Sequence, residues 1–159
     1  MNAIAMLTKQ HREMESSLKA VLDANGRSQR TLLEQAADVL MSHVLVEEKH
    51  FYPAVKAKRT EDILLESLEE HLALKRLVAD LLALSVSDEQ FEPKVHVLKE
   101  QAEHHHREEE ENLFPKVTKL LSADELEALG KRMGTFQAEL LRKKPRTLAD
   151  GQTEAAAKL

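Results

Sequence analysis

The sequence contains no cysteine among its 159 residues, and this absence excludes several kinds of chemistry. Disulfide bonds, thiolate zinc sites, iron–sulfur clusters and a cysteine nucleophile are all ruled out. Aromatic residues make up only 3 % of the chain, and glycine and proline occur four times each. A chain poor in turn formers and rich in leucine, alanine, glutamate and lysine has the composition of an all-helical protein.

Long apolar runs are also missing. No stretch approaches the ~20 residues that a membrane-spanning helix needs. Lys9, His11 and Arg12 interrupt the first segment, so no signal peptide is predicted. The net charge of −5 is well mixed, and the short basic cluster at 142–146 is interpreted as a solvated helix end. We therefore expect a cytoplasmic protein with no nucleic-acid or membrane partner.

Apolar residues recur at three- and four-residue spacing, which predicts five helices. Their approximate ranges are 3–24, 28–58, 61–84, 93–115 and 122–141. The Asn25-Gly26 pair is expected to end the first helix, and Thr60 to cap the third. Pro53 and Pro115 should bend or end the second and fourth helices. The sequence Ser122-Ala-Asp-Glu125 predicts a capping box that opens the fifth helix.

The four long helices are joined by short links, which make sequential neighbours antiparallel. The predicted fold is therefore all-α, an up-down-up-down four-helix bundle followed by a fifth C-terminal helix. Residues 1–143 are predicted to form one domain, since the chain has the length of a single domain with its own core. The polar, small-residue segment 144–159 is predicted to be a disordered tail.

An internal repeat links two parts of the chain. Residues 42–53 match residues 104–115 when shifted by 62 positions. The shift places His43 on His105, Glu47 on Glu109, Glu48 on Glu110, Tyr52 on Phe114 and Pro53 on Pro115. A lone histidine, His11 or His71, lies upstream of each copy. The sequence thus predicts two helical hairpins, each with a histidine followed by His-x-x-x-Glu.

The repeated residues form a pattern suited to metal binding. Residues four apart lie on one helix face, so each His-x-x-x-Glu pair can aim an imidazole and a carboxylate at one point. The two lone histidines lie on otherwise apolar rows and should also point inward. Unpaired, these groups would be costly to bury, whereas two cations would satisfy them together. The predicted metal ligands are His11, His43, Glu47, His71, His105 and Glu109. No catalytic residue is assigned.

Two histidine positions are ambiguous from the sequence alone. His104 and His106 flank His105 and compete with it, although the repeat favours His105. His96 is about half a turn out of phase and is expected to be exposed. A lone inward histidine is more often a core residue than a ligand, so the assignment depends on the whole set.

Four further residues lie near the predicted ligands. His50 shares the face of His43 and could add a ligand or line the access to the site. Tyr52 could supply a phenolate oxygen to ferric iron, but on a regular helix it faces away from His43. Glu48 and Glu110 are interpreted as outer hydrogen-bond partners or surface residues.

Mixed imidazole and carboxylate ligation indicates the metal. It suits iron or manganese, whereas closed structural zinc sites favour thiolates. Two non-haem iron ions, bridged by an oxo or hydroxo oxygen, are the favoured reading. Zinc and manganese are the alternatives, because the affinity order places zinc above ferrous iron.

At these residues the sequence resembles the hemerythrin-like, or HHE cation-binding, family. Both halves carry His-x-x-x-Glu-Glu followed by an aromatic residue and proline, and residues 121–130 are similar to the helix that commonly follows the bundle. The resemblance implies the six ligands named above, with Glu47 and Glu109 bridging the ions. One position departs from it, because Lys75 stands where the oxygen-carrying hemerythrins have a second histidine. An open metal position favours reaction with small oxidants.

The resemblance implies several functions. The favoured hypothesis is a di-iron protein that reacts with O2, H2O2 or NO, including catalase-like peroxide decomposition or a role in oxidative stress. Reversible dioxygen binding or sensing, or iron storage without catalysis, is the alternative. Iron delivery to iron–sulfur clusters is less favoured without cysteine, and a metal-free interaction protein is disfavoured by the His/Glu set. We expect a monomer or weak homodimer.

Overall fold

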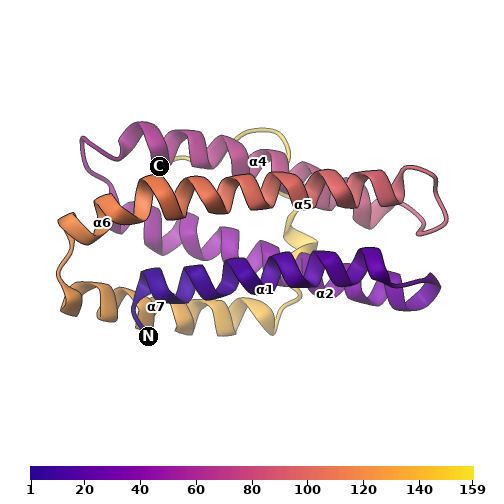
Figure 1. Ribbon diagram of the computed structural model, residues 1–159, viewed down its shortest axis with the longest axis horizontal. Helices are drawn as coiled ribbons and strands as arrows, with labels where there is room; N and C mark the ends of the chain where they lie inside the picture. The colour runs from indigo at the N-terminus through magenta and orange to yellow at the C-terminus, as the bar shows by residue number, and fades with distance from the viewer.

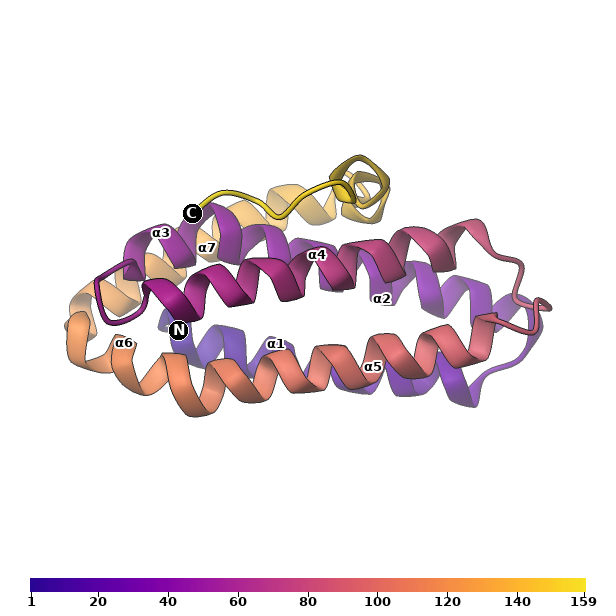
Figure 2. The ribbon, with the colours of Figure 1, turned by 90° about the horizontal axis from the view of Figure 1, so that it is seen from above.

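A computed structural model describes residues 1–159, which form helices and no strands. The four long helices are α1 (Ala3–Asp23), α2 (Gly26–Val46), α4 (Glu61–Ala83) and α5 (Phe91–Glu108). They run side by side along the long axis of the molecule, each antiparallel to the next (Figures 1 and 2). The predicted four-helix bundle is therefore confirmed. No helix combines the length and apolar character needed to cross a bilayer.

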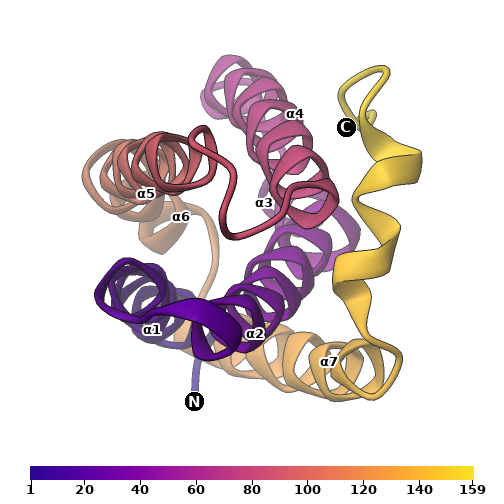
Figure 3. The ribbon, with the colours of Figure 1, turned by 90° about the vertical axis from the view of Figure 1, so that its right-hand side faces the viewer.

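The predicted fifth helix is α7 (Ala123–Leu141), and it lies outside the bundle. Viewed along the bundle, it runs beside α1 and α2 (Figure 3). Ser122 accepts a hydrogen bond from the backbone of Glu125, whose carboxylate accepts one from the backbone of Ser122. This is the predicted capping box.

A wide π-turn interrupts the helical path at the same place in both copies of the repeat. These turns are η1 (Glu47–Phe51) and η2 (Glu109–Leu113), and their first residues differ by 109 − 47 = 62 positions. Each is followed by a short helix with proline in its first turn, α3 (Tyr52–Val55) or α6 (Phe114–Leu120). A π-turn bonds five residues back and adds one residue to the turn. The prolines thus follow a widened helix, and the second long segment ends at Val55 rather than near residue 58.

Two helix ends differ from the predictions. Gly26 has the left-handed φ of 59°, but it is the first residue of α2 and not the stop of α1, which ends at Asp23. Thr60 occupies the N-cap position of α4, as predicted, but its hydroxyl makes no capping hydrogen bond to the helix. Its hydroxyl donates to the Val55 carbonyl and accepts from the Ala57 backbone, which fixes the turn before the helix.

The apolar core is divided into two clusters along the bundle. Leu7 of α1 belongs to one cluster and Met14 to the other, with His11 between them in sequence. On α4, Leu68 and Leu74 flank His71 in the same way. A fully buried leucine contributes ~1.5–3 kcal/mol. The two apolar clusters therefore stabilise a bundle that carries a polar layer between them.

The prediction of a disordered tail is wrong. The segment forms two short 3₁₀ helices, η3 (Pro145–Leu148) and η4 (Asp150–Gln152), which pack on α2 and α4 (Figure 3). The Arg146 guanidinium pairs with Asp38 at 2.7 Å, and Arg76 donates to the Thr153 carbonyl at 2.8 Å. These polar contacts, together with Ala149, which is fully buried in the apolar core, order the segment. The domain boundary at residue 143 stays a prediction.

Candidate metal centre

The polar layer of the bundle contains all six residues predicted to bind metal. Their side chains are at most 1 % exposed, and each long helix contributes to the layer. They are His11 from α1, His43 and Glu47 from α2 and η1, His71 from α4, and His105 and Glu109 from α5 and η2. Ligand atoms of Glu47, His71 and His105 lie within 4.8 Å of one another, as do those of His43, Glu47 and Glu109.

The two carboxylates contact histidines of both hairpins. Glu47 Oε1 lies 2.7 Å from His43 Nε2 and 3.5 Å from His71 Nε2. Glu109 Oε1 lies 3.2 Å from His11 Nε2 and 3.3 Å from His105 Nε2. We call His11 and His43 the first half-site, and His71 and His105 the second half-site. Each carboxylate is thus placed between the half-sites, where it could bridge two ions.

Several polar atoms at the centre are buried without a hydrogen-bond partner. They are Nε2 of His11, Nε2 of His43, both carboxylate oxygens of Glu47 and Oε1 of Glu109. Their close contacts with one another lack hydrogen-bond geometry. An unsatisfied buried polar group costs about 1–3 kcal/mol, more when it is charged, and such groups are rare in native proteins. Imidazole nitrogens and carboxylate oxygens aimed at one point fit a pair of cations, which would satisfy them together.

The outer nitrogens of the four half-site histidines are all hydrogen-bonded. The Nδ1 contacts are His11 to Glu110 at 3.1 Å, His43 to Gln10 at 2.8 Å, His71 to Glu48 at 2.8 Å and His105 to Glu70 at 2.9 Å. An oxygen acceptor requires the proton on Nδ1, so Nε2 of the neutral ring presents its lone pair to the centre. Such partners orient metal-binding histidines and raise their basicity.

Glu48 and Glu110 fit their interpretation as outer partners, whereas Gln10 and Glu70 were not predicted. A weaker repeat in the sequence could have found them. A shift of 60 positions places His11 on His71 and also Gln10 on Glu70.

His106 is a buried histidine that the sequence prediction left out. Its side chain is 2 % exposed, whereas that of His104 is 55 % exposed. The His106 ring stacks on the His11 ring with centroids 4.0 Å apart, and its Nδ1 lies 3.1 Å from Glu15 Oε1. Ligand atoms of His106, His11 and His43 lie within 4.8 Å of one another. The run of three histidines was the only signal for it, and Val44 at its repeat position argued against it.

Tyr52 lies in the centre, contrary to the prediction that it faces away. Its hydroxyl donates to Glu109 Oε2 at 2.9 Å and lies 3.1 Å from His71 Nε2. The reason is the π-turn, because one extra residue rotates the following side chains by about 100° relative to a regular helix. Its repeat partner Phe114 is turned inward as well and stacks on His11 with centroids 5.9 Å apart.

His50 and His96 are not brought into the centre. The His50 ring packs against Phe136 of α7 with centroids 4.8 Å apart. His96 is 57 % exposed, in agreement with its phase on the helix. Neither residue completes the half-site that Lys75 leaves short of a histidine.

Lys75 is a buried cation beside the second half-site. Its side chain is 2 % exposed, and Nζ pairs with Glu48 Oε1 at 2.9 Å. The other oxygen of Glu48 bonds His71 Nδ1. Burial raises the pKa of Glu48, but the hydrogen bond from His71 and the charge of Lys75 outweigh it and lower the pKa. The lysine therefore holds an ionised Glu48 in place as the partner of His71.

The pKa values of His11, His106 and His105 are shifted in different directions. Burial and the nearby His43 lower the pKa of His11 to about 2. Burial and the adjacent His11 also lower the pKa of His106 far below its ordinary value. Burial opposes charge on His105 too, but the Glu109 and Glu47 carboxyls outweigh it and raise its pKa well above 6.5.

The pKa values of the two central carboxyls are shifted in opposite directions. Burial raises the pKa of Glu109 well above its ordinary value, and the neighbouring Glu47 carboxylate raises it further. Burial would also raise the pKa of Glu47, but the adjacent His43, with Glu109 and His105 close by, lowers it well below the ordinary value. Without a cation, the mutual repulsion of the two carboxylates therefore opposes full ionisation of the pair.

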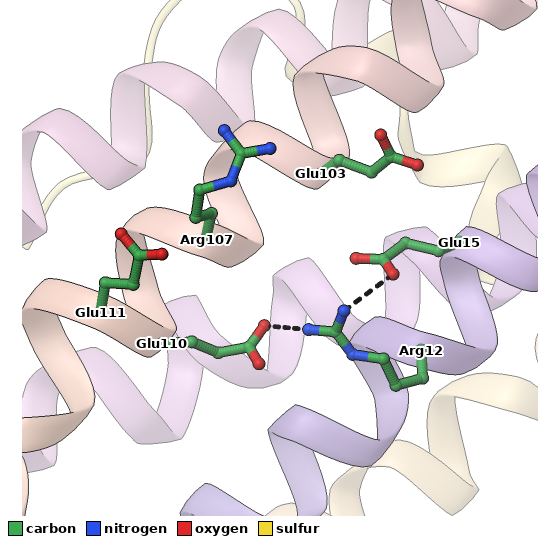
Figure 4. Close-up of a pocket in the computed structure, with 6 residues that line it drawn as sticks. All are labelled: Arg12, Glu15, Glu103, Arg107, Glu110 and Glu111. Atoms are coloured by element: carbon green, nitrogen blue, oxygen red, sulfur yellow. Dashed lines mark hydrogen bonds and ion pairs between the residues drawn. The ribbon is translucent and has the colours of Figure 1, made fainter.

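A charged surface pocket of about 380 Å³ lies outside the first half-site. It is lined by Arg12, Glu15, Glu103, Arg107, Glu110 and Glu111 (Figure 4). Arg12 lies between Glu110 and Glu15 and pairs with both. These two carboxylates also accept from His11 and His106, so the outer partners of two central histidines line a pocket open to solvent.

Comparisons with known proteins agree with this geometry. Residues 2–117 match the family described as the hemerythrin HHE cation binding domain. A crystal structure of a hemerythrin HHE cation binding domain-containing protein from Mycobacterium kansasii superposes with a TM-score of 0.81, at 22 % identity over 93 % of this chain and 92 % of that chain. That likeness shows the fold.

A curated relative is much longer than this chain. A protein of Nostoc sp. named DNA nickase is 32 % identical over 88 residues, which are 55 % of this chain and 25 % of the nickase. The match thus covers about a quarter of that relative. Because the family match covers most of the present sequence, the chain belongs to the hemerythrin HHE cation-binding domain family.

Proposed function

We propose that this protein binds two non-haem iron ions at its polar layer and reacts there with O2, H2O2 or NO. Catalase-like decomposition of peroxide, in which two H2O2 give two H2O and one O2, is the activity we favour. The observation that carries the proposal is the set of buried, partnerless nitrogen and oxygen atoms aimed at one another from both hairpins. A pair of cations accounts for all of them.

The choice of iron comes from the donor set. Histidine nitrogens and bridging carboxylates, with no thiolate in the chain, suit iron or manganese better than structural zinc. Glu47 and Glu109 would bridge the ions, and His11, His43, His71 and His105 would hold them. When bound, iron supplies redox and Lewis-acid chemistry toward a small oxidant.

The protein's own residues prepare the site for this chemistry. The outer hydrogen bonds fix the histidine rings, so little reorganisation accompanies binding. The apolar clusters on both sides limit the water that reaches the layer. Tyr52 holds its hydroxyl proton between its own oxygen and Glu109 Oε2, which places a proton donor beside the second half-site.

Metal analysis and a peroxide assay on the same preparation test this proposal. Protein purified with and without oxygen should contain about two iron atoms per chain and show ultraviolet–visible charge-transfer bands. Added peroxide should release oxygen at an oxygen electrode. Reversible spectral change on deaeration without peroxide turnover would support the alternative of dioxygen binding, sensing or storage. Colourless protein with stoichiometric zinc would overturn every proposal that depends on redox-active iron. A cytoplasmic location and a monomer or weak homodimer stay predictions.

A further inference from the structure

His106 has the features of a metal-binding histidine without belonging to the predicted set. Glu15 occupies its Nδ1, just as oxygen acceptors occupy Nδ1 of the four half-site histidines. Because the Glu15 carboxylate only accepts, Nε2 of the neutral His106 ring is left with its lone pair. The ligand atoms of His106, His11 and His43 lie within 4.8 Å of one another.

The internal repeats show that this arrangement occurs once. The shift of 62 positions places Val44 on His106, and Val44 is buried in an apolar cluster. The shift of 60 positions places Lys75 on Glu15. The second half-site therefore lacks both the histidine and the carboxylate that would hold it. The two hairpins therefore differ at two linked positions, where one has His106 and its partner Glu15 and the other has Val44 and Lys75.

A packing role alone does not explain the residue. An aliphatic or phenyl side chain could stack on His11 without burying ring nitrogens, whose transfer from water is costly unless they have a partner. Glu15 supplies such a partner to Nδ1 alone.

We propose that His106 is a metal ligand, so that the first half-site holds its ion through three histidines and the second through two. The proposal rests on the metal centre of the proposed function. It places the position left for a small molecule at the second half-site, beside Tyr52. The protein thus has five histidine ligands, with the fifth at His106 rather than at position 75.

The test uses His106→Ala and His106→Gln, with His104→Ala as the matched control from the same run of histidines. Each full-length protein is reconstituted with ⁵⁷Fe, and bound iron is measured by chelator competition and Mössbauer spectroscopy. Losing an outer partner of a metal ligand typically weakens binding about 10–100-fold, so losing the ligand should weaken one iron at least as much. One quadrupole doublet should change while the other is kept, and exogenous imidazole should restore it in His106→Ala.

The outcomes separate this inference from the proposed function. Two firmly bound irons with native doublets in both His106 variants would overturn the ligand and leave the di-iron centre standing. Native protein that binds no iron would overturn both. Circular dichroism of the apoproteins identifies a folding defect, and His106→Gln, which keeps a polar side chain near Glu15, then decides the result.

Discussion

The two half-sites share the same backbone features but differ in the side chains that complete them. Each has a π-turn, an inward aromatic ring and histidines oriented through Nδ1. The first half-site adds His106 and has the apolar ring of Phe114, whereas the second has Val44 and the hydroxyl of Tyr52 at the repeat positions. The internal repeat gives the two half-sites the same backbone arrangement, and the differences at these repeat positions make their side chains unequal.

The inequality extends to charge. The first half-site contains histidines that burial keeps neutral, which favours holding a cation. The second contains His105, whose pKa is raised by two carboxyls, and the Tyr52 hydroxyl, whose pKa burial and Glu109 also raise. The two half-sites thus differ in the pKa shifts of their histidines and in the Tyr52 hydroxyl, which lies at the second half-site.

The largest expected effect comes from removing Glu109, a carboxylate that contacts histidines of both half-sites. Glu109→Ala should reduce bound iron from about two atoms per chain to nearly none, because this carboxylate contacts His11 and His105 together. The melting temperature of the iron-loaded protein should fall with it, since metal binding contributes to folding free energy. Metal analysis and calorimetry measure both. Exposed Glu111→Ala should behave as native, and full metal content in Glu109→Ala would refute the bridging role.

A second pair of variants separates the half-sites. His105→Ala leaves one histidine in the second half-site, whereas His43→Ala leaves His11 and His106 at the first. His105→Ala should therefore weaken its iron about tenfold or more beyond the loss in His43→Ala. Chelator competition on both variants gives the ratio. Equal losses would mean that the half-sites have equal numbers of ligands.

The third prediction concerns pH and uses apoprotein. The folded-state pKa of His11 and of His106 lies below the ordinary 6.5, so the unfolded chain binds more protons at lower pH. The free energy of unfolding should fall as pH drops below about 6.5, by up to about 1.4 kcal/mol per pH unit for each residue. His105 and Glu109 have the opposite shift, and their contributions are lost as pH rises through their raised pKa values, so Glu109 partly offsets the fall.

Urea denaturation between about pH 6.5 and about pH 5 measures this dependence. His106→Gln should reduce the slope of unfolding free energy against pH by the contribution of one histidine. Exposed His96→Gln should leave that slope unchanged. An equally steep dependence in His106→Gln would show that His106 titrates normally in the folded protein.

The smallest expected effect on stability comes from exchanging the aromatic residues at the two repeat positions, Tyr52 and Phe114. Tyr52→Phe removes the donor to buried Glu109 Oε2 and should lower the free energy of unfolding of the apoprotein by about 1–3 kcal/mol. Chemical denaturation measures the change. Adding Phe114→Tyr should not restore the loss, because its hydroxyl would lie at the other half-site. Native stability in Tyr52→Phe would contradict the importance of this hydrogen bond.

Regular periodicity made much of this centre predictable. His43 near the end of α2 and Glu47 at the start of η1 lie one turn apart, so helix geometry alone predicted their common face. The repeat extended that prediction to His105 and Glu109. The lone His11 and His71 followed from their apolar neighbours. In each case, the spacing in the sequence directly determines the position in the bundle.

The residues that were missed depend on departures from regularity or on contacts between helices. Tyr52 was expected to face away because a regular helix was assumed across Glu47–Phe51, where the structure has a π-turn. His106 and Glu15 meet across two helices, which no spacing within one helix reveals. The tail was expected to be disordered because composition does not show that Arg146 reaches Asp38.

The paired π-turns also define which changes in chain length the protein can tolerate. Deleting one residue within 48–51 would restore an ordinary helical turn and rotate everything after it by about 100°. Tyr52 would swing away from Glu109, and Pro53 would meet the carbonyls of a regular helix. An engineered bundle that copied every ligand but omitted this single extra residue would keep its histidines and lose the phenol beside them.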